Sequence, residues 1–397
     1  MTALALDAEP ACPGAAEALP DTTDRVLGAL RAERRPFDEF SREEWDDLVE
    51  RTPWATVFSS WAFQRAWWEA YSANAHEEIL AVVPADALPG AAPVAIVPLM
   101  HRHEVEPSDA LTHTRMRHGR DLALTPVPAT ATDIFFGASY HADYATILAD
   151  PAELPAVAAA TAIYLAGPAA DDWDVVDLRR LRCADPAGDH LAAALGALEM
   201  ANAWTLNVER EDVCPVVTFP DGVDMEGFLA TLGKKERHEI RRKVRRAQAV
   251  GEIRLEDSAR PLDDLEAFIA LHQKRWGEDG LFPATQGGEQ SRVFIRRLFE
   301  LFGPDGPMRL TFLTVGGRCI ASGIHFETAD SLLYYNAGVD PDARDLSPGV
   351  LMIHAYVARA LANGTRRMDF LRGNESYKYE WGAVDEPIQR LLVRRSV

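Results

Sequence analysis

The feature that most constrains this fold is a series of three β-rich segments close together in the second half of the chain, at residues 309–315, 319–327 and 332–338. Gly316 and Gly317 separate the first two segments, and a two-residue Gly-Gly connection is typical of an antiparallel hairpin. The sequence that follows predicts one helix and two further strands, at residues 348–363, 366–371 and 388–393. This order predicts a mixed sheet that is covered by helices.

The rest of the chain divides into a leader and two halves. Residues 1–35 are rich in Ala, Pro, Asp and Glu without periodicity, which predicts a poorly ordered leader. Residues 36–205 alternate between helix and strand signals, and the segments 79–83 and 94–99 predict an antiparallel pair. Residues 206–397 then form the second predicted domain, so we expect two α/β domains after the leader.

Acidic charge is concentrated in the first half. The 397-residue chain has a formal net charge of −20, and residues 1–205 hold 14 Lys and Arg against 32 Asp and Glu, whereas residues 206–397 hold 27 against 29. Because phosphate attraction needs a basic field, we do not expect DNA binding. The four cysteines lack the paired spacing of a zinc site, so no metal is expected. No segment has the pattern of a membrane span or a secretory signal, which predicts a cytoplasmic protein without a membrane partner.

A polar and aromatic segment follows the strand predicted at residues 366–371. The sequence there is Arg372-Gly373 followed by Asn-Glu-Ser-Tyr-Lys-Tyr-Glu-Trp-Gly at residues 374–382. It resembles the C-terminal signature of the CelD/BioF2-like acyltransferases, a branch of the GNAT superfamily related to the FemABX aminoacyl ligases. The resemblance implies an α/β (α+β) fold of two tandem GNAT-like domains, each with a mixed, mostly antiparallel sheet flanked by helices.

Side chains of this segment are the first candidates for catalysis. The resemblance implies that Lys378 contacts substrate near the transfer centre, where its ammonium could stabilise an oxyanion. Glu375 could act as the base for an attacking amine or hydroxyl, and Tyr377 could donate a hydrogen bond. Trp381 is a candidate for substrate binding. The alternative is a surface turn in which the aromatic rings close the core and the lysine is solvated.

A possible anion site lies between the strand at 332–338 and the helix at 348–363. Unpaired N–H groups and the helix dipole favour an anion at such a junction. In GNAT enzymes it holds the pyrophosphate of acyl-CoA, and the resemblance implies that Arg344, Ser347, Gly349 and Val350 bind the cofactor there. The resemblance also implies that the strand edge near Asn336 binds the pantetheine arm. The usual Gly-rich signature is absent, and only Ser-Pro-Gly remains. Alternatively, Ser347 caps the helix and Gly349 is incidental.

Three isolated polar residues are further candidates. His325 could be a general base, or it could be a buried structural histidine. Arg372 could bind a carboxylate or phosphate of the substrate, or it could pair with Asp369. Residues 136–144 resemble the Gly-x-x-x-x-Asp-Tyr loop of the same family, so that Asp143 or His141 could meet the acceptor across the cleft from Lys378; a simple turn is the alternative.

A basic segment at residues 234–246 belongs to a longer predicted helix at 225–250. It contains eight Lys or Arg and two Glu, with Ile240 and Val244 as its predicted buried stripe. The resemblance places this helix at the interdomain cleft and implies substrate binding by Arg237 and Arg241. Its anion could be a CoA phosphate, a nucleotide-linked substrate, a polysaccharide acid, an aminoacyl-tRNA or the acidic first half. A solvated face without a ligand is the alternative.

Together, these observations favour an acyltransferase. The expected reaction moves an acyl group from acyl-CoA, for example acetyl-CoA, to an amine or hydroxyl of a small-molecule or saccharide acceptor. Such a reaction needs positioning, a base and an oxyanion donor, but no metal. One alternative is a Fem-like ligase that uses aminoacyl-tRNA. Another is a non-catalytic scaffold in polysaccharide or natural-product assembly.

Overall fold

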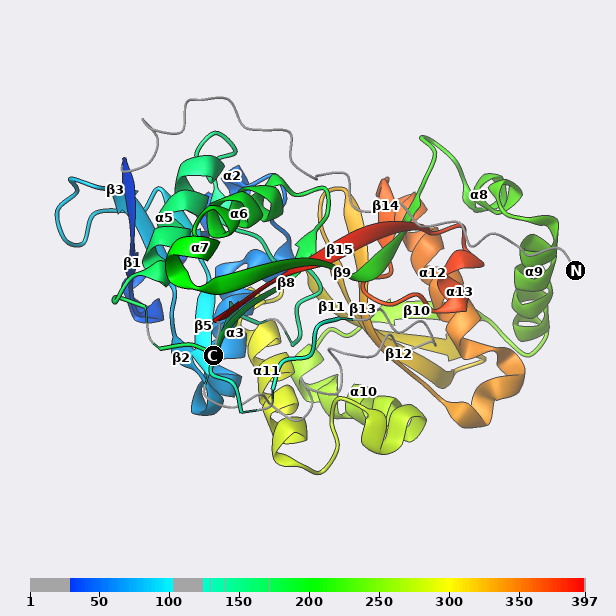
Figure 1. Ribbon diagram of the computed structural model, residues 1–397. Helices are drawn as coiled ribbons and strands as arrows, with labels where there is room; N and C mark the ends of the chain where they lie inside the picture. Colours follow the sequence, from blue (N-terminus) through cyan, green and yellow to red (C-terminus); the bar gives the residue numbers. More distant parts are fainter. Residues whose placement is uncertain (1–28, 103–123, 129, 139, 171, 396–397) are drawn as a thin grey trace, which may run out of the picture.

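The computed structural model describes residues 29–102, 124–128, 130–138, 140–170 and 172–395. Two sheets organise this part of the chain (Figure 1). The smaller sheet has four strands, in the order β1 (Leu30–Arg34), β3 (Leu80–Pro84), β4 (Ala95–Val97) and β7 (Leu148–Ala149). The larger sheet has eleven strands and runs through both halves. Their order is β10 (Ile253–Asp257), β11 (Met308–Val315), β12 (Arg318–Glu327), β13 (Ser331–Val339), β14 (Arg367–Asp369), β9 (Trp204–Thr218), β15 (Val384–Arg395), β8 (Val175–Arg182), β6 (Asp133–Phe136), β5 (Leu99–Arg102) and β2 (His76–Glu77).

Most neighbouring strands are antiparallel. The pairs β13–β14 and β6–β8 are parallel, while the other named pairs in the described residues are antiparallel. The predicted mixed, mostly antiparallel sheet is therefore confirmed. The predicted pair at 79–83 and 94–99 is also confirmed, as β3 and β4.

Helices cover both faces of the sheet in the second half. They are α8 (Met225–Thr231), α9 (Lys234–Gln248), α10 (Pro261–Trp276), α11 (Gln286–Phe302), α12 (Pro348–Ala362) and α13 (Ser376–Tyr379). Gly323 and Gly338 of the central strands show how close the covering helices come. A side chain at Gly323 would collide with Tyr356 of α12, and one at Gly338 would collide with the backbone of α10 at His272. Thus α12 packs on one face and α10 on the other.

The first half has its own covering helices. These are α2 (Arg42–Arg51), α3 (Trp61–Tyr71), α5 (Leu154–Ala166), α6 (Pro186–Ala197) and the short α7 (Glu199–Asn202). α5 consists mainly of small apolar residues. Its buried residues pack with β3, β4 and β8 in one core cluster. α3 instead reaches the second half, where the ring of Phe63 lies 5.3 Å from that of Phe294 in α11.

The last strand joins the two halves. Figure 1 shows β15 in red between β9 of the second half and β8 of the first. Buried Arg390 of β15 donates to both carboxylate oxygens of Asp177 in β8, at 2.6 and 2.8 Å. A charged pair of this kind replaces the lost hydration of both groups. The predicted boundary near residue 205 falls at the start of β9 and remains a prediction.

Three local predictions are wrong. Residues 30–34 do not belong to the leader; they form β1, because their backbone pairs with β3, which composition does not show. The helix predicted at 225–250 is two helices, since Gly233 has extended backbone angles and leaves room for the Glu236 carboxylate. Strand β10 at residues 253–257 was not predicted, because its apolar face consists of two residues, Ile253 and Leu255, which is a short signal. Residues 1–28 of the predicted leader lie outside the described residues.

Candidate functional site

A gap in the large sheet opens between β13 and the chain that follows β14. The two strands pair only from Ser331 to Leu333 of β13. Beyond β14 the chain stays with β9, since the N–H of Phe370 donates to Pro215 O at 3.0 Å and that of Gly373 to Val213 O at 2.9 Å. Within the described residues, the rest of β13 has β12 as its one strand partner. Residues 334–339 therefore present a backbone edge to the gap.

The N-terminus of α12 lies at the end of this edge. A short 3-10 helix at Pro341–Leu346 connects β13 to Ser347, which has left-handed backbone angles. The predicted side-chain cap by Ser347 is wrong: its hydroxyl accepts a hydrogen bond from Arg246 of α9 at 2.8 Å. Gly349 has open space where a side chain would begin. An unshielded helix N-terminus beside a guanidinium suits an anion.

The remaining residues predicted to bind a cofactor surround this junction. Arg344 is exposed on the 3-10 helix, and Val350 is partly buried in the first turn of α12. Asn336 is partly buried on the open part of β13, two residues after Tyr334, whose ring packs against Tyr356 of α12. The structure thus gathers these residues from one strand, one connection and one helix. It adds Arg246, which was not singled out within the basic segment.

On the opposite side of the gap, Lys378 organises the loop that follows β14. Its ammonium donates to the carbonyls of Leu371, Arg372 and Gly373, each at 2.9 Å, and it lies 2.9 Å from a carboxylate oxygen of Glu375. The side chain is only 2% exposed. Leu371 and Gly373 both have positive φ, which turns their carbonyls toward the lysine. An ammonium has three protons, and the three carbonyls of this loop accept one hydrogen bond each. The donors of Lys378 are therefore all used in holding the loop.

The same loop contacts the first half of the chain. Arg372 Nε lies 3.3 Å from Asp143, and both side chains are largely buried. Asp369 instead accepts a hydrogen bond from Tyr144 at 2.7 Å, so the alternative pairing of Arg372 with Asp369 is not found. Beside them, the hydroxyl of partly buried Tyr335 donates to the carbonyl of His141 at 3.1 Å. Burial and the nearby Asp143 carboxylate raise the pKa of Tyr335. The 136–144 loop thus contacts the C-terminal segment directly, and an encounter of Asp143 or His141 with an acceptor stays a prediction.

The corresponding gap in the first half is closed by the chain itself. β6 and β8 pair in parallel over three positions, as β13 and β14 do. Beyond them, however, Ala145 bridges Leu181 and its N–H donates to Arg180 O at 3.0 Å. The segment after β6 thus covers the edge of β8. In the second half, by contrast, the gap beside residues 334–339 of β13 is open.

Comparisons with known proteins agree with this arrangement. Residues 234–379 match the family described as acetyltransferase (GNAT) domain. Residues 234–379 are called the GNAT domain because of this match. The solved structure of FemX has a TM-score of 0.54 at 11% identity and covers 88% of this chain and 96% of its own, so this chain has the FemX fold.

Other solved structures are less similar. A conserved protein of unknown function from Bacteroides thetaiotaomicron has a TM-score of 0.49 at 10% identity, covering 90% of this chain and 98% of its own. A tandem GNAT protein from the clavulanic acid biosynthesis pathway has a TM-score of 0.45 at 11% identity, covering 92% of this chain and 98% of its own. No curated protein sequence matches this chain.

His325 lies on β12, opposite Tyr334 of β13. It is fully buried, and its ring packs against Tyr356 of α12 at 4.7 Å. Its Nε2 lies 3.3 Å from Glu327, which is also bound by Arg359. Burial lowers the pKa of His325. This environment corresponds to the alternative of a structural histidine.

The basic helix α9 does not face the first half. Figure 1 shows it at the far end of the GNAT domain, separated from α5 and α6. Arg237 donates to Ala230 O at 3.2 Å, and Arg241 forms an ion pair with Glu226, so both side chains bind α8. The expected cleft position is therefore wrong, because Ile240 and Val244 pack toward α12 instead. Their predicted burial is confirmed.

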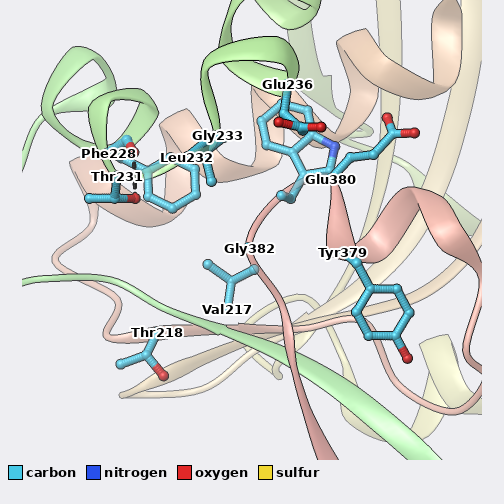
Figure 2. Close-up of a pocket in the computed structure, with 11 residues that line it drawn as sticks. Val217, Thr218, Phe228, Thr231, Leu232, Gly233, Glu236, Tyr379, Glu380 and Gly382 are labelled. Carbon is cyan, nitrogen blue, oxygen red and sulfur yellow. Dashed lines mark hydrogen bonds between the residues drawn. The ribbon is translucent and has the colours of Figure 1, made fainter. Parts of the chain in front are cut away.

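A pocket of about 270 Å³ lies between α8, α9, the end of β9 and the segment after α13 (Figure 2). Trp381, which is 1% exposed, lines it. Tyr377, on the same short helix as Tyr379 of the pocket, is 37% exposed and packs against Phe370, 6.1 Å from ring to ring. α13 thus carries one tyrosine toward the pocket and another toward the strand that borders the gap.

Neither a metal site nor a membrane helix is found in the part of the chain that the structure describes. No cluster of three or more His, Cys, Asp or Glu side chains there could hold a metal ion. None of the described helices is long and apolar enough to span a bilayer.

Proposed function

We propose that this protein is an N-acyltransferase that takes an acyl group from acyl-CoA and transfers it to an amine or hydroxyl of a small-molecule or saccharide acceptor. The observation that carries the proposal is the open edge of β13 at residues 334–339, which leads to the N-terminus of α12. A pantetheine arm carries amide groups along an extended chain. It can therefore pair with an open strand edge as an added strand would.

The phosphates of the donor fit the junction at the end of this edge. Gly349 leaves space at the first turn of α12, and Arg246 and Arg344 supply positive charge. Backbone N–H groups at a helix start bind phosphate without any specific motif. The proposed phosphate site therefore does not require the Gly-rich signature.

The transfer itself requires a base and hydrogen-bond donors for the oxyanion. The acceptor nitrogen or oxygen attacks the thioester carbonyl, its proton passes to a base, and the intermediate collapses with release of CoA as thiolate. Glu375 and Tyr377 are the candidates for these roles on the loop beside the gap. Arg372, paired with Asp143, provides a charged position for the acceptor on the first-half side. Lys378 holds the loop in place.

A matched pair of glycine variants tests donor binding. Gly349 and Gly287 are each the second residue of a helix, α12 and α11, and neither has an atom within 4 Å of where a side chain would start. Gly349→Glu should weaken acetyl-CoA binding at least about tenfold by calorimetry, because it places a carboxylate at the phosphate position. Gly287→Glu should bind like the wild type. Equal affinity of both variants, or no binding by the wild type, would contradict the proposal.

The second candidate is a Fem-like ligase with aminoacyl-tRNA as donor. Exposed cations along α9 favour it, among them Lys234, Lys235 and Arg245. Binding of tRNA to this face should weaken steeply with salt, and replacing Lys234 and Lys235 by Glu should reduce that dependence. Salt-sensitive tRNA binding without acetyl-CoA binding would favour the ligase. Binding of neither ligand would favour a scaffold.

A further inference from the structure

The pocket between α8, α9 and residues 379–382 has no role in the proposed transfer. Figure 2 shows residues of α8 and the start of α9 on one side of it and Tyr379 on another. Its eleven lining residues are Val217, Thr218, Phe228, Thr231, Leu232, Gly233, Glu236, Tyr379, Glu380, Trp381 and Gly382. With a volume of about 270 Å³, it is close in size to the smaller ligand pockets of proteins. It therefore has room for one small ring compound.

The pocket is negatively charged. Glu236 and Glu380 contribute carboxylates, whereas none of the eleven lining residues is Lys, Arg or His. In the part of the chain described by the structure, neither carboxylate has an ion-pair partner. Glu236 folds back over Gly233, where a side chain would collide with it. Two carboxylates without a cation favour a positively charged ligand.

The buried indole of Trp381 adds a second requirement. This side chain is 1% exposed and lines the pocket, and its N–H has no hydrogen-bond acceptor among the described residues. Although the side chain is buried, its N–H reaches solvent, so an oxygen atom of a ligand in the pocket can accept a hydrogen bond from it. Val217, Phe228 and Leu232 provide an apolar surface beside it. The lining therefore favours a ligand that carries a positive charge, an oxygen acceptor and an apolar ring face.

We propose that this pocket binds an amino sugar or a closely related cyclic amino alcohol. Its protonated amine would lie between Glu236 and Glu380, a ring hydroxyl would accept from the Trp381 indole, and its C–H face would pack on the apolar side chains. The two carboxylates distinguish such a compound from a neutral sugar, which lacks the charge. The inference concerns ligand binding in the absence of CoA, so it stands or fails separately from the proposed acyl transfer.

Calorimetry with three sugars tests the inference on the full chain. Glucosamine, at a pH where its amine is protonated, should bind at least about tenfold more tightly than glucose, which has a hydroxyl in place of the amine. N-acetylglucosamine, which lacks the charge, should bind as weakly as glucose. Equal affinity for glucosamine and glucose would overturn the proposal, as would the absence of glucosamine binding.

Matched glutamate variants locate the binding. Glu236→Gln and Glu380→Gln should each weaken glucosamine binding about tenfold, because each removes one charge with little change in shape. Glu239→Gln is the control, since Glu239 lies on the same helix but pairs with Arg242 and does not line the pocket. Glucosamine binding that is unchanged by Glu236→Gln and Glu380→Gln, or equally reduced by Glu239→Gln, would place the sugar elsewhere and refute the proposal. Retained acetyl-CoA binding in these variants would show that they are folded.

Discussion

The guanidinium of Arg372 lies 3.3 Å from the carboxylate of Asp143, which joins the loop after β14 to the first half of the chain. The sequence predicts that Asp143 faces Lys378 across a cleft, whereas the structure pairs Asp143 directly with Arg372. The pair is largely shielded from water, with side chains 20% and 14% exposed. It is therefore one of the contacts, together with β15, that hold the first half against the GNAT domain.

A double-mutant cycle measures this connection. Arg372→Ala and Asp143→Ala should each destabilise the protein, and their combined effect should fall short of the sum by about 1 kcal/mol, because they remove the same interaction. Urea unfolding provides the measurement. Arg254 and Glu252, an exposed pair at 2.6 Å, should show no measurable coupling. Full additivity for Arg372 and Asp143 would mean that the contact contributes nothing.

Replacement of Lys378 should affect stability before it affects chemistry. In Lys378→Met, the carbonyls of Leu371, Arg372 and Gly373 lose their donor and Glu375 loses its cation. We expect a loss of about 3 kcal/mol in the free energy of unfolding. Replacement of the exposed Lys235 by Met should change the free energy of unfolding little. A fully stable Lys378→Met variant that has lost transfer activity would instead support a direct catalytic role.

Two cations on α9 should differ in their effect on donor binding. Arg246 contacts Ser347 at the start of α12, whereas Lys234 lies twelve residues earlier, about 18 Å along the helix. Arg246→Ala should therefore weaken acetyl-CoA binding about tenfold, and Lys234→Ala should leave it unchanged. Titration calorimetry of both variants checks this. Equal losses would point to a diffuse electrostatic effect of the whole helix.

His325 should make stability depend on pH near neutrality. Burial lowers its pKa from the ordinary value of 6.5, so the unfolded chain takes up the proton more readily than the folded one. The contribution of neutral His325 to stability is complete above pH 6.5 and is lost as the pH falls below 6.5. Between about pH 7.5 and pH 5.5 the free energy of unfolding of the wild type should fall by about 1 kcal/mol more than that of His325→Gln. His238→Gln, on the exposed side of α9, should behave like the wild type in urea unfolding at both pH values.

Local sequence was sufficient for three central strands and one helix of the GNAT domain, but not for β10 or for the break at Gly233. The strands predicted at 309–315, 319–327 and 332–338 match β11, β12 and β13 to within one residue at each end, and the helix at 348–363 matches α12 equally well. The stripe of Ile240 and Val244 was also predicted from spacing. Period-2 and period-3.6 patterns set these features, because each records which side of a single element is buried.

Tertiary packing decided the remainder of the site. The Tyr-Lys-Tyr motif marked an important loop, but its sequence did not show that Lys378 points inward to three carbonyls of that loop. Packing of α9 on α12 brought Arg246 to Ser347, 101 residues away in the sequence. The position of β15 between β8 and β9 is likewise a long-range result. Residue identity determined the elements and their apolar faces, whereas contacts between distant segments determined which polar groups were already satisfied and which remained available to a ligand.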